Sequence, residues 1–193
     1  MARPRLHLSG DPEADAVLSR DPLALLIGMV LDQQIPLEKA FSSPAELARR
    51  LGKPLDAAEI AAMDPDDLAT IFKERPALHR FPGSMAGRVQ EVCRTVAEDY
   101  KNKAENVWKG AKDGDELFTR VKALPGFGDQ KAKIFVALLG KQLGVQPDGW
   151  RNAAKPFGAQ GTLLSVADIT DAESMAKVRA AKKAAKAKAR ATA

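Results

Sequence analysis

The 193-residue chain is predicted to fold as an all-α protein, and three observations lead to this prediction. Alanine and leucine dominate the apolar residues while aromatic residues make up only 5% of the chain, a composition that favours packed helices over sheets. Apolar residues recur at helical spacing along one face of several segments. Asp-Pro pairs at Asp11, Asp21 and Asp64 combine an N-cap with a first helical position, which is a strong signal for a helix start.

The first part of the chain contains the segment expected to be most deeply buried. Residues 1–10 are expected to be irregular, and a short helix follows Asp11. Residues 23–34 are nearly all apolar up to a polar end at Asp32-Gln33-Gln34, and a helix that is apolar all round is predicted to be a central one. Pro36 disfavours helix at the preceding residue, so Gln34 lies at the end of this helix or in the next turn. There it can cap the helix or project into a cleft, and both interpretations stay open.

The remaining elements follow from breaks and caps. Ser42-Ser43-Pro44 is expected to separate two helices, and Val107 and Trp108 are expected to pin a polar connection to the body. Residues 162–166 have strand propensity but no visible partner strand, so coil or helix is expected. The other expected helices cover residues 36–41, 44–50, 56–63, 65–73, 84–100, 115–122 and 129–142. Residues 1–170 are assigned to one helical domain, and 171–193 to a last helix that grades into a frayed or disordered Ala/Lys tail.

Charge is distributed unevenly. The net charge is +5, but residues 176–193 carry seven basic residues and no acids, which leaves the body at 5 − 7 = −2. The tail is therefore expected to add nonspecific, salt-sensitive DNA affinity, with a log–log salt slope steeper by up to about 6 units, unless it is only a solvated charge run. The tail residues assigned to this contact are Lys182, Lys183, Lys186, Lys188 and Arg190.

Cys93 is the only cysteine, which excludes an intrachain disulfide and any cysteine-ligated zinc or iron–sulfur centre. The N-terminus lacks an apolar signal core, and no apolar run approaches membrane-spanning length. We therefore expect a cytoplasmic protein with no membrane partner.

The stretch with the clearest functional signal is Leu124-Pro125-Gly126-Phe127-Gly128. Its two glycines permit a tight reversal, and the helix that starts at once leaves backbone N–H groups free to hold a phosphate. Helices on both sides make this a helix-hairpin-helix that binds one DNA phosphate without reading sequence. A monovalent cation, K⁺ or Na⁺, can bridge the phosphate to the backbone of Leu124 and Gly126. An ordinary helix–helix turn is the alternative.

Polar residues after the hairpin extend the predicted site. Gln130 and Lys131 belong to the stretch expected to contact the phosphate. Asp148 follows the second helix in a Gly/Pro-rich loop, where it can cap the next helix. If that loop returns to the same cleft, its carboxylate can stabilise a cationic sugar and orient a water, which is the chemistry of N-glycosidic bond cleavage.

At these residues the chain resembles the helix-hairpin-helix/Gly-Pro-Asp superfamily of DNA glycosylases. The hairpin matches the family hairpin, and Asp148, 22 residues after Gly126, matches the second family signature. Residues 29–34 resemble the buried family helix that ends in a glutamine. Residues 78–86 are similar to a signature of an actinobacterial branch of this superfamily. The resemblance covers roughly residues 21–157.

The resemblance implies two helical subdomains with the hairpin at the cleft between them. It also implies a protein that acts as a monomer on double-stranded DNA and flips a damaged base out of the duplex into a pocket. Gln34 is then the residue expected to enter the gap that the base leaves, and Asp148 is the catalytic residue. The pocket candidates are Trp150, Met29 and His79, although Trp150 can equally pack in the core.

Two departures from the family bear on the reaction. Members that also cut the strand carry a lysine where this chain has Gln130, and Lys131, about 100° further round the helix, is expected to point elsewhere. A monofunctional glycosylase that uses water and no cofactor is therefore expected. The iron–sulfur cluster of many relatives cannot be built. The alternatives are a bifunctional glycosylase/lyase that uses Lys131 or Lys133, and a non-catalytic DNA-binding module.

Overall fold

The computed structural model describes residues 5–191 and confirms the all-α prediction. Within those residues there is no strand, and the one isolated β-bridge joins Asp113 and Asp148. The expectation for residues 1–4 and the last two tail residues lies outside the described part of the chain. The helices are α1 (Pro12–Arg20), α2 (Pro22–Leu31), α3 (Leu37–Leu51), α4 (Ala57–Ala62), α5 (Pro65–Lys73), α6 (Pro82–Asp99), η1 (Ala104–Val107), α7 (Gly114–Lys122), α8 (Asp129–Gln142), α9 (Trp150–Ala153), η2 (Val166–Asp168) and α10 (Ala172–Ala191).

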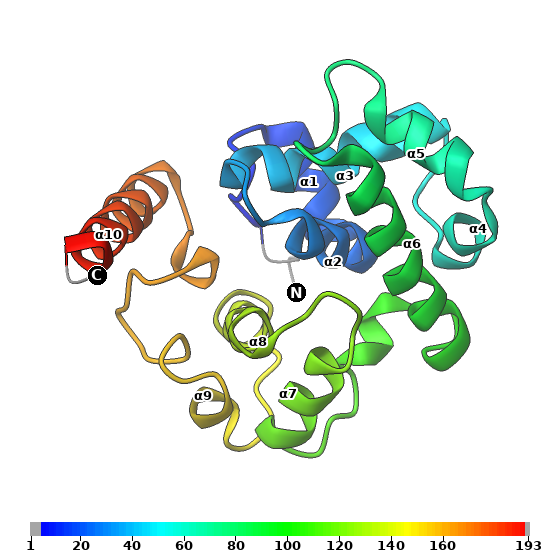
Figure 1. The fold of residues 1–193 in the computed structure, drawn as a ribbon. Coiled ribbons are helices and arrows are strands. Elements are labelled where there is room, and N and C mark those ends of the chain that lie inside the picture. Colours follow the sequence, from blue (N-terminus) through cyan, green and yellow to red (C-terminus); the bar gives the residue numbers. More distant parts are fainter. Residues whose placement is uncertain (1–4, 192–193) are drawn as a thin grey trace.

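The helices form two halves along the sequence. Helices α1–α6 make the N-terminal half, and α7–α10 make the C-terminal half, with α2 and α8 facing each other between them (Figure 1). A hydrogen bond from Lys131 of α8 to the backbone carbonyl of Val30 in α2 joins the halves at this point. We call this boundary, where Lys131 meets Val30, the seam.

The predicted Asp-Pro helix starts are confirmed. Asp11 accepts a hydrogen bond from the backbone N–H of Glu13, and Asp21 accepts from Leu23 and Ala24. Asp64 accepts from the first turn of α5 in the same way. Each carboxylate therefore satisfies N–H groups that a helix leaves unpaired at its start.

Helix α2 is the central helix that its all-round apolar sequence predicted. Its residues from Leu23 through Leu31 are all buried. Gly28 lets α3 approach closely, because a Cβ there would lie 2.7 Å from a ring carbon of Phe41. Contact between α2 and α3 thus fixes where the end of α2 and the turn after it lie.

The predicted break at Ser42-Ser43-Pro44 is wrong, because α3 runs through Pro44 as one helix. The Ser43 hydroxyl lies 2.7 Å from the backbone carbonyl of Lys39, one turn back, instead of accepting from an N–H ahead of it. A serine bonded backwards in this way is a helix-interior residue and not a cap. Pro44 removes one N–H from the helix without ending it.

The C-terminal half contains the predicted hairpin helices, α7 and α8, which pack against each other. Val107 and Trp108 are buried and hold the preceding connection to the body, as expected. Residues 162–165 are not a strand and lead into η2, which packs on α8.

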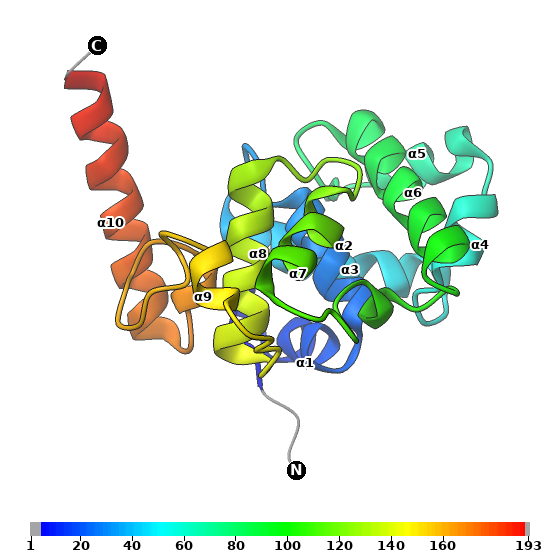
Figure 2. The ribbon, with the colours of Figure 1, turned by 90° about the horizontal axis from the view of Figure 1, so that it is seen from below.

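Helix α10 differs from the expected disordered tail, because it continues to Ala191. Only its first turns pack against the body, through Met175 and Val178. The rest projects away from the body (Figure 2). Alanine at most positions between the basic residues gives this stretch high helix propensity without a packed face.

Candidate functional site

The hairpin between α7 and α8 presents open backbone. The Phe127 N–H donates to the Leu124 carbonyl at 3.1 Å, which closes the turn, and Gly126 has φ +80°. A Cβ at Gly126 or Gly128 would meet nothing within 4 Å, so both face free space. Leu124 and Phe127 are buried and anchor the turn, with the Phe127 ring centroid 5.9 Å from that of Phe135.

The first turn of α8 has no side-chain cap at Gly128, so its leading N–H groups are available to an anion. The carboxylate of Asp129 is held beside them by Lys122 at 3.3 Å and Lys133 at 2.8 Å. These hydrogen bonds keep the pKa of Asp129 below its ordinary value. Gln130 is exposed, and Lys133 is engaged on the outer surface of the hairpin.

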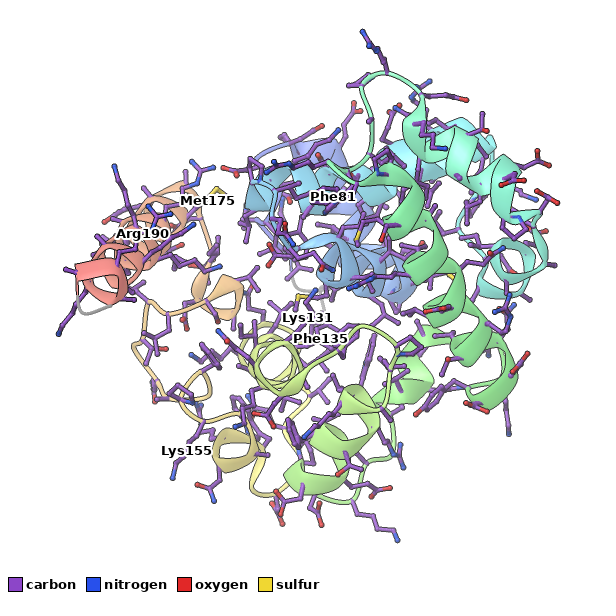
Figure 3. All side chains as sticks on the ribbon, in the orientation of Figure 1. Phe81, Lys131, Phe135, Lys155, Met175 and Arg190 are labelled. Atoms are coloured by element: carbon purple, nitrogen blue, oxygen red, sulfur yellow. The ribbon has the colours of Figure 1, made fainter. Side chains whose placement is uncertain are left out.

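Lys131 points into the seam (Figure 3). The sequence predicted only that it points elsewhere than Gln130, which stands at the position of the strand-cutting lysine. The Lys131 ammonium donates to the Val30 carbonyl at 3.2 Å, an acceptor that the end of α2 leaves without a helical partner. Burial lowers the pKa of Lys131. The reason is the rotation of α8, since Phe135 and Leu138 follow Lys131 by four and seven positions and are both buried.

The two glutamines after α2 have different roles. The Gln33 side-chain amide donates to the Val30 carbonyl at 2.8 Å and so caps α2. Gln34 is exposed and has φ +58° in the turn that follows. The capping interpretation therefore belongs to Gln33, and Gln34 is left to face solvent.

His79 ties this turn to the loop before α6. Its Nδ1 accepts from the Phe81 N–H at 3.0 Å, so Nε2 carries the proton and donates to the Gln33 carbonyl at 2.9 Å. The imidazole is buried, which lowers its pKa. His79 is thus a positioning residue for two loops. The sequence analysis had named it as a pocket candidate, but its side chain is buried and lines no open pocket.

Phe81 is a surface residue that the sequence analysis missed. Its side chain is 42% exposed, and Arg80 lies over its ring with the guanidinium carbon 5.4 Å from the centroid. Through His79 it is held next to the Gln33-Gln34 turn. A large aromatic residue in a loop, between an arginine and Pro82, was the available signal, because such a residue has no helical face to pack.

Asp148 is not brought to the seam. Its backbone carbonyl accepts from the Gly114 N–H at 2.7 Å, so it lies beside the start of α7. The hairpin follows the other end of α7, and nine residues of helix separate the ends by about 13 Å at a rise of about 1.5 Å per residue. The loop turns beside the end of α8 and does not run back along it, because the Val145 N–H donates to the Leu139 carbonyl and the Trp150 N–H donates to the Pro147 carbonyl. The Asp148 side chain is exposed.

Trp150 packs as a structural residue. It is 6% exposed, and a Cβ on Gly140 of α8 would lie 2.4 Å from its ring. Arg151 covers the ring with its guanidinium carbon at 4.4 Å from the centroid. Trp150 therefore lies near the C-terminal end of α8 with Asp148. Met29 is fully buried inside α2.

Asp32 is a second residue that the sequence analysis missed. It is the residue after α2, between Val30 and the Gln34 turn, and it is half-buried. Burial raises its pKa, and the charges of Lys182 and Lys131 act in the opposite direction. The carboxylate therefore lies near two ammonium groups of the C-terminal half.

Helix α10, which carries Lys182, contributes further cations that meet acids of the protein. Arg179 forms an ion pair with Glu38 of α3, and Lys177 pairs with Glu173 within the helix at 2.5 Å. A hollow of about 610 Å³ opens elsewhere, on residues of α1 and α3 such as Glu13 and Arg49, and it does not include the seam residues.

Two other features, a metal site and a membrane-spanning helix, were sought in the part of the chain that the structure describes. Between residues 5 and 191, no three His, Cys, Asp or Glu side chains are placed to hold a metal ion together. None of the helices in this part of the chain combines the length and apolarity that a bilayer crossing requires.

An uncapped helix start behind an open glycine turn leaves backbone N–H groups free at the hairpin, which is the arrangement of the class of helical proteins that hold a nucleic-acid phosphate. A family model described as HhH-GPD superfamily base excision DNA repair protein matches residues 27–193, and the chain belongs to that superfamily. No curated protein and no solved structure matches the chain. Since most members of the family are DNA glycosylases, the chain falls in that general class of DNA-acting enzymes.

Proposed function

We propose that this protein is a monofunctional DNA glycosylase that removes a damaged base from duplex DNA. The observation that carries the proposal is the Lys131–Val30 hydrogen bond, which joins the start of α8, directly after the hairpin, to the end of α2, directly before the Gln34 turn. A phosphate at the hairpin and a base pair at the Gln34 turn can therefore belong to one bound duplex.

DNA contact divides between the two halves. The N–H groups at Gly126, Gly128 and the start of α8 hold one phosphate, with K⁺ or Na⁺ bridging at the carbonyls of Leu124 and Gly126. Gln34 enters the space of the flipped base, and Phe81 stacks against a neighbouring base. The protein acts as a monomer on DNA in the cytoplasm. No base is specified by these contacts.

Water is the proposed nucleophile, because Gln130 stands at the position of the strand-cutting lysine and is exposed. Hydrolysis adds the water oxygen to the sugar C1′ and releases the base, leaving an abasic site. Duplexes carrying deaminated, alkylated or oxidised bases should release free base, detected by mass spectrometry, without strand breaks. Retained DNA binding with no base released from any lesion would instead make the protein a non-catalytic binding module.

Gly128→Ala tests the phosphate seat without disturbing the fold. Gly128 has φ −73° and free space at its Cβ, so alanine fits the backbone but places a methyl group where the phosphate would approach. DNA affinity should fall by about 10-fold or more, since a hydrogen bond to a charged group is lost. Fluorescence anisotropy measures this loss.

The melting temperature is the internal control for Gly128→Ala. Gly87→Ala, at an equally open glycine of α6, should leave affinity at the wild-type level. Equal DNA affinity for the wild type, Gly128→Ala and Gly87→Ala would show that the hairpin does not contact DNA.

The placement of Lys131 favours one second candidate, a bifunctional glycosylase/lyase. A half-buried lysine with a lowered pKa is suited to attack C1′ as a neutral amine, whereas Lys133 is held by Asp129 outside the seam. Borohydride traps the Schiff base of such an enzyme. A trapped adduct in wild-type protein that is absent from Lys131→Met would replace the monofunctional proposal with this one.

A further inference from the structure

The carboxylates in the interior are committed to partners, with one exception at the seam. Asp15 accepts from the N–H groups of Leu8 and Ser9, Asp21 caps α2, and Asp168 pairs with Lys141 at 2.5 Å. For Asp32, no donor within residues 5–191 reaches hydrogen-bond or ion-pair distance of the carboxylate. A half-buried charge without a bound partner is costly, which makes its position informative.

Asp32 lies where the proposed DNA contacts converge. It follows the Val30 carbonyl that Lys131 binds by two residues, and it precedes Gln34 by two residues. Lys131 and Lys182 are the cations whose charges act on it, one from the start of α8 and one from α10. By contrast Asp148 lies at the far end of α7.

We propose that Asp32 is the catalytic carboxylate of this protein and that it takes the place that the loop carboxylate Asp148 was expected to fill. This inference rests on the proposed glycosylase function and assigns its catalytic group. The group comes from the N-terminal half and from the same turn as the residue that fills the base gap.

The step that Asp32 supports is a hydrolysis. The bond between the base nitrogen and C1′ breaks with both electrons leaving on the base, and the anionic carboxylate stabilises the positive charge that develops on the sugar. Water adds its oxygen to C1′ and gives its proton to the Asp32 carboxylate, and that proton then passes through solvent to the departing base. The products are the free base and an abasic site with a hydroxyl at C1′.

The two lysines have a positioning role in this scheme. Desolvation alone would favour the protonated, inactive acid, and the nearby ammonium groups oppose it. Lys131 also fixes α8, and with it the hairpin, relative to the turn that carries Asp32. The phosphate seat and the carboxylate are thereby held in one arrangement.

Asp32→Asn and Asp148→Asn form the decisive pair, because each removes a charge without changing side-chain size. They are compared in single-turnover base release from a lesion duplex that the wild type processes. Asp32→Asn should lower the rate by about 100-fold or more, the usual scale for a group that acts on a proton in the transition state, while DNA affinity changes little. Asp148→Asn should retain the wild-type rate.

The reverse result, with Asp32→Asn active and Asp148→Asn inactive, overturns the assignment but leaves the glycosylase function intact. Failure of the wild type to release any base defeats the proposed function itself, so the two failures are distinguishable. Circular dichroism and melting temperature exclude misfolding. Asp32→Glu provides a second check. It restores a carboxylate, so it should recover part of the rate if the charge and the proton transfer cause the effect. A rate no higher than that of Asp32→Asn would contradict the catalytic role of Asp32.

Discussion

At the scale of single residues, His79 shows how one buried side chain positions two loops. Its two ring nitrogens are both used, one by the Phe81 N–H and one by the Gln33 carbonyl. Only the neutral ring can do this, because a proton on Nδ1 would remove the acceptor for Phe81. The pH dependence of stability therefore reports on the loops that hold Gln34 and Phe81.

Burial lowers the pKa of His79 from its ordinary 6.5, so the unfolded chain binds a proton at a higher pH than the folded protein does. The free energy of unfolding contributed by His79 is fully present above pH 6.5 and is lost as pH falls through the lower folded pKa. His79→Phe should cost about 1–3 kcal/mol at pH 7.5 and less at pH 5. Urea unfolding at both pH values measures this difference, and a cost that does not shrink at pH 5 contradicts the assigned tautomer.

The sequence predicted single residues only where local backbone chemistry decides them. Gly126 was predicted at a turn that needs positive φ, and the structure gives it φ +80°. Gln130 and Lys131 could not be separated in the same way, because the residue that faces the seam is decided by how α8 rotates when Phe135 packs. Residue spacing fixes the angle between two side chains but not which of them meets a neighbouring helix.

At the scale of elements, α8 connects the hairpin to the body through its contact with α9. Gly140 is needed there, because any Cβ would overlap the Trp150 ring. This contact also explains why the Asp148 loop was misplaced. The sequence predicted the four turns of α8, but the short loop after them stops where Trp150 docks, and a docking site of this kind depends on tertiary packing.

Gly140→Ala tests the packing of α8 against α9. The added methyl group must displace the Trp150 ring, which should lower the free energy of unfolding by about 1–3 kcal/mol. In a Trp150→Leu background the same change should cost markedly less, and a double-mutant cycle measures that coupling. Additive effects of the two substitutions would mean that the ring does not contact α8, and would reopen the interpretation of Trp150 as a pocket wall.

At the scale of the whole molecule, the basic residues of α10 fall into two groups. Lys177, Arg179 and Lys182 each lie near an acid of the protein, namely Glu173, Glu38 and Asp32. The full tail therefore cannot add seven independent phosphate contacts. We expect a salt slope shallower than the value of about 6 that a simple count of cations predicts.

The distal part of α10 should supply the contacts that remain. Replacing Lys183, Lys186 and Arg190 by glutamine should reduce the log–log salt slope of DNA binding by up to about 2.7 units, at about 0.9 unit per phosphate. Lys103, Lys112 and Lys155, replaced together, are the control, because they are exposed cations in loops away from α10. Equal slopes for wild type and the α10 variant would show that this helix does not follow the DNA backbone.

In the polar contacts between the two halves, the positive group comes from the C-terminal half each time. Cations of the C-terminal half, Lys131, Arg179 and Lys182, face a carbonyl or carboxylate of the N-terminal half. At the Arg179–Glu38 pair, a phosphate of a bound duplex is a rival anion for the guanidinium, so a DNA contact there displaces one of the protein's own acids. The affinity for DNA and the attachment of α10 to α3 are then opposing demands on one side chain, and Glu38→Gln, which weakens that attachment alone, should bind DNA more tightly.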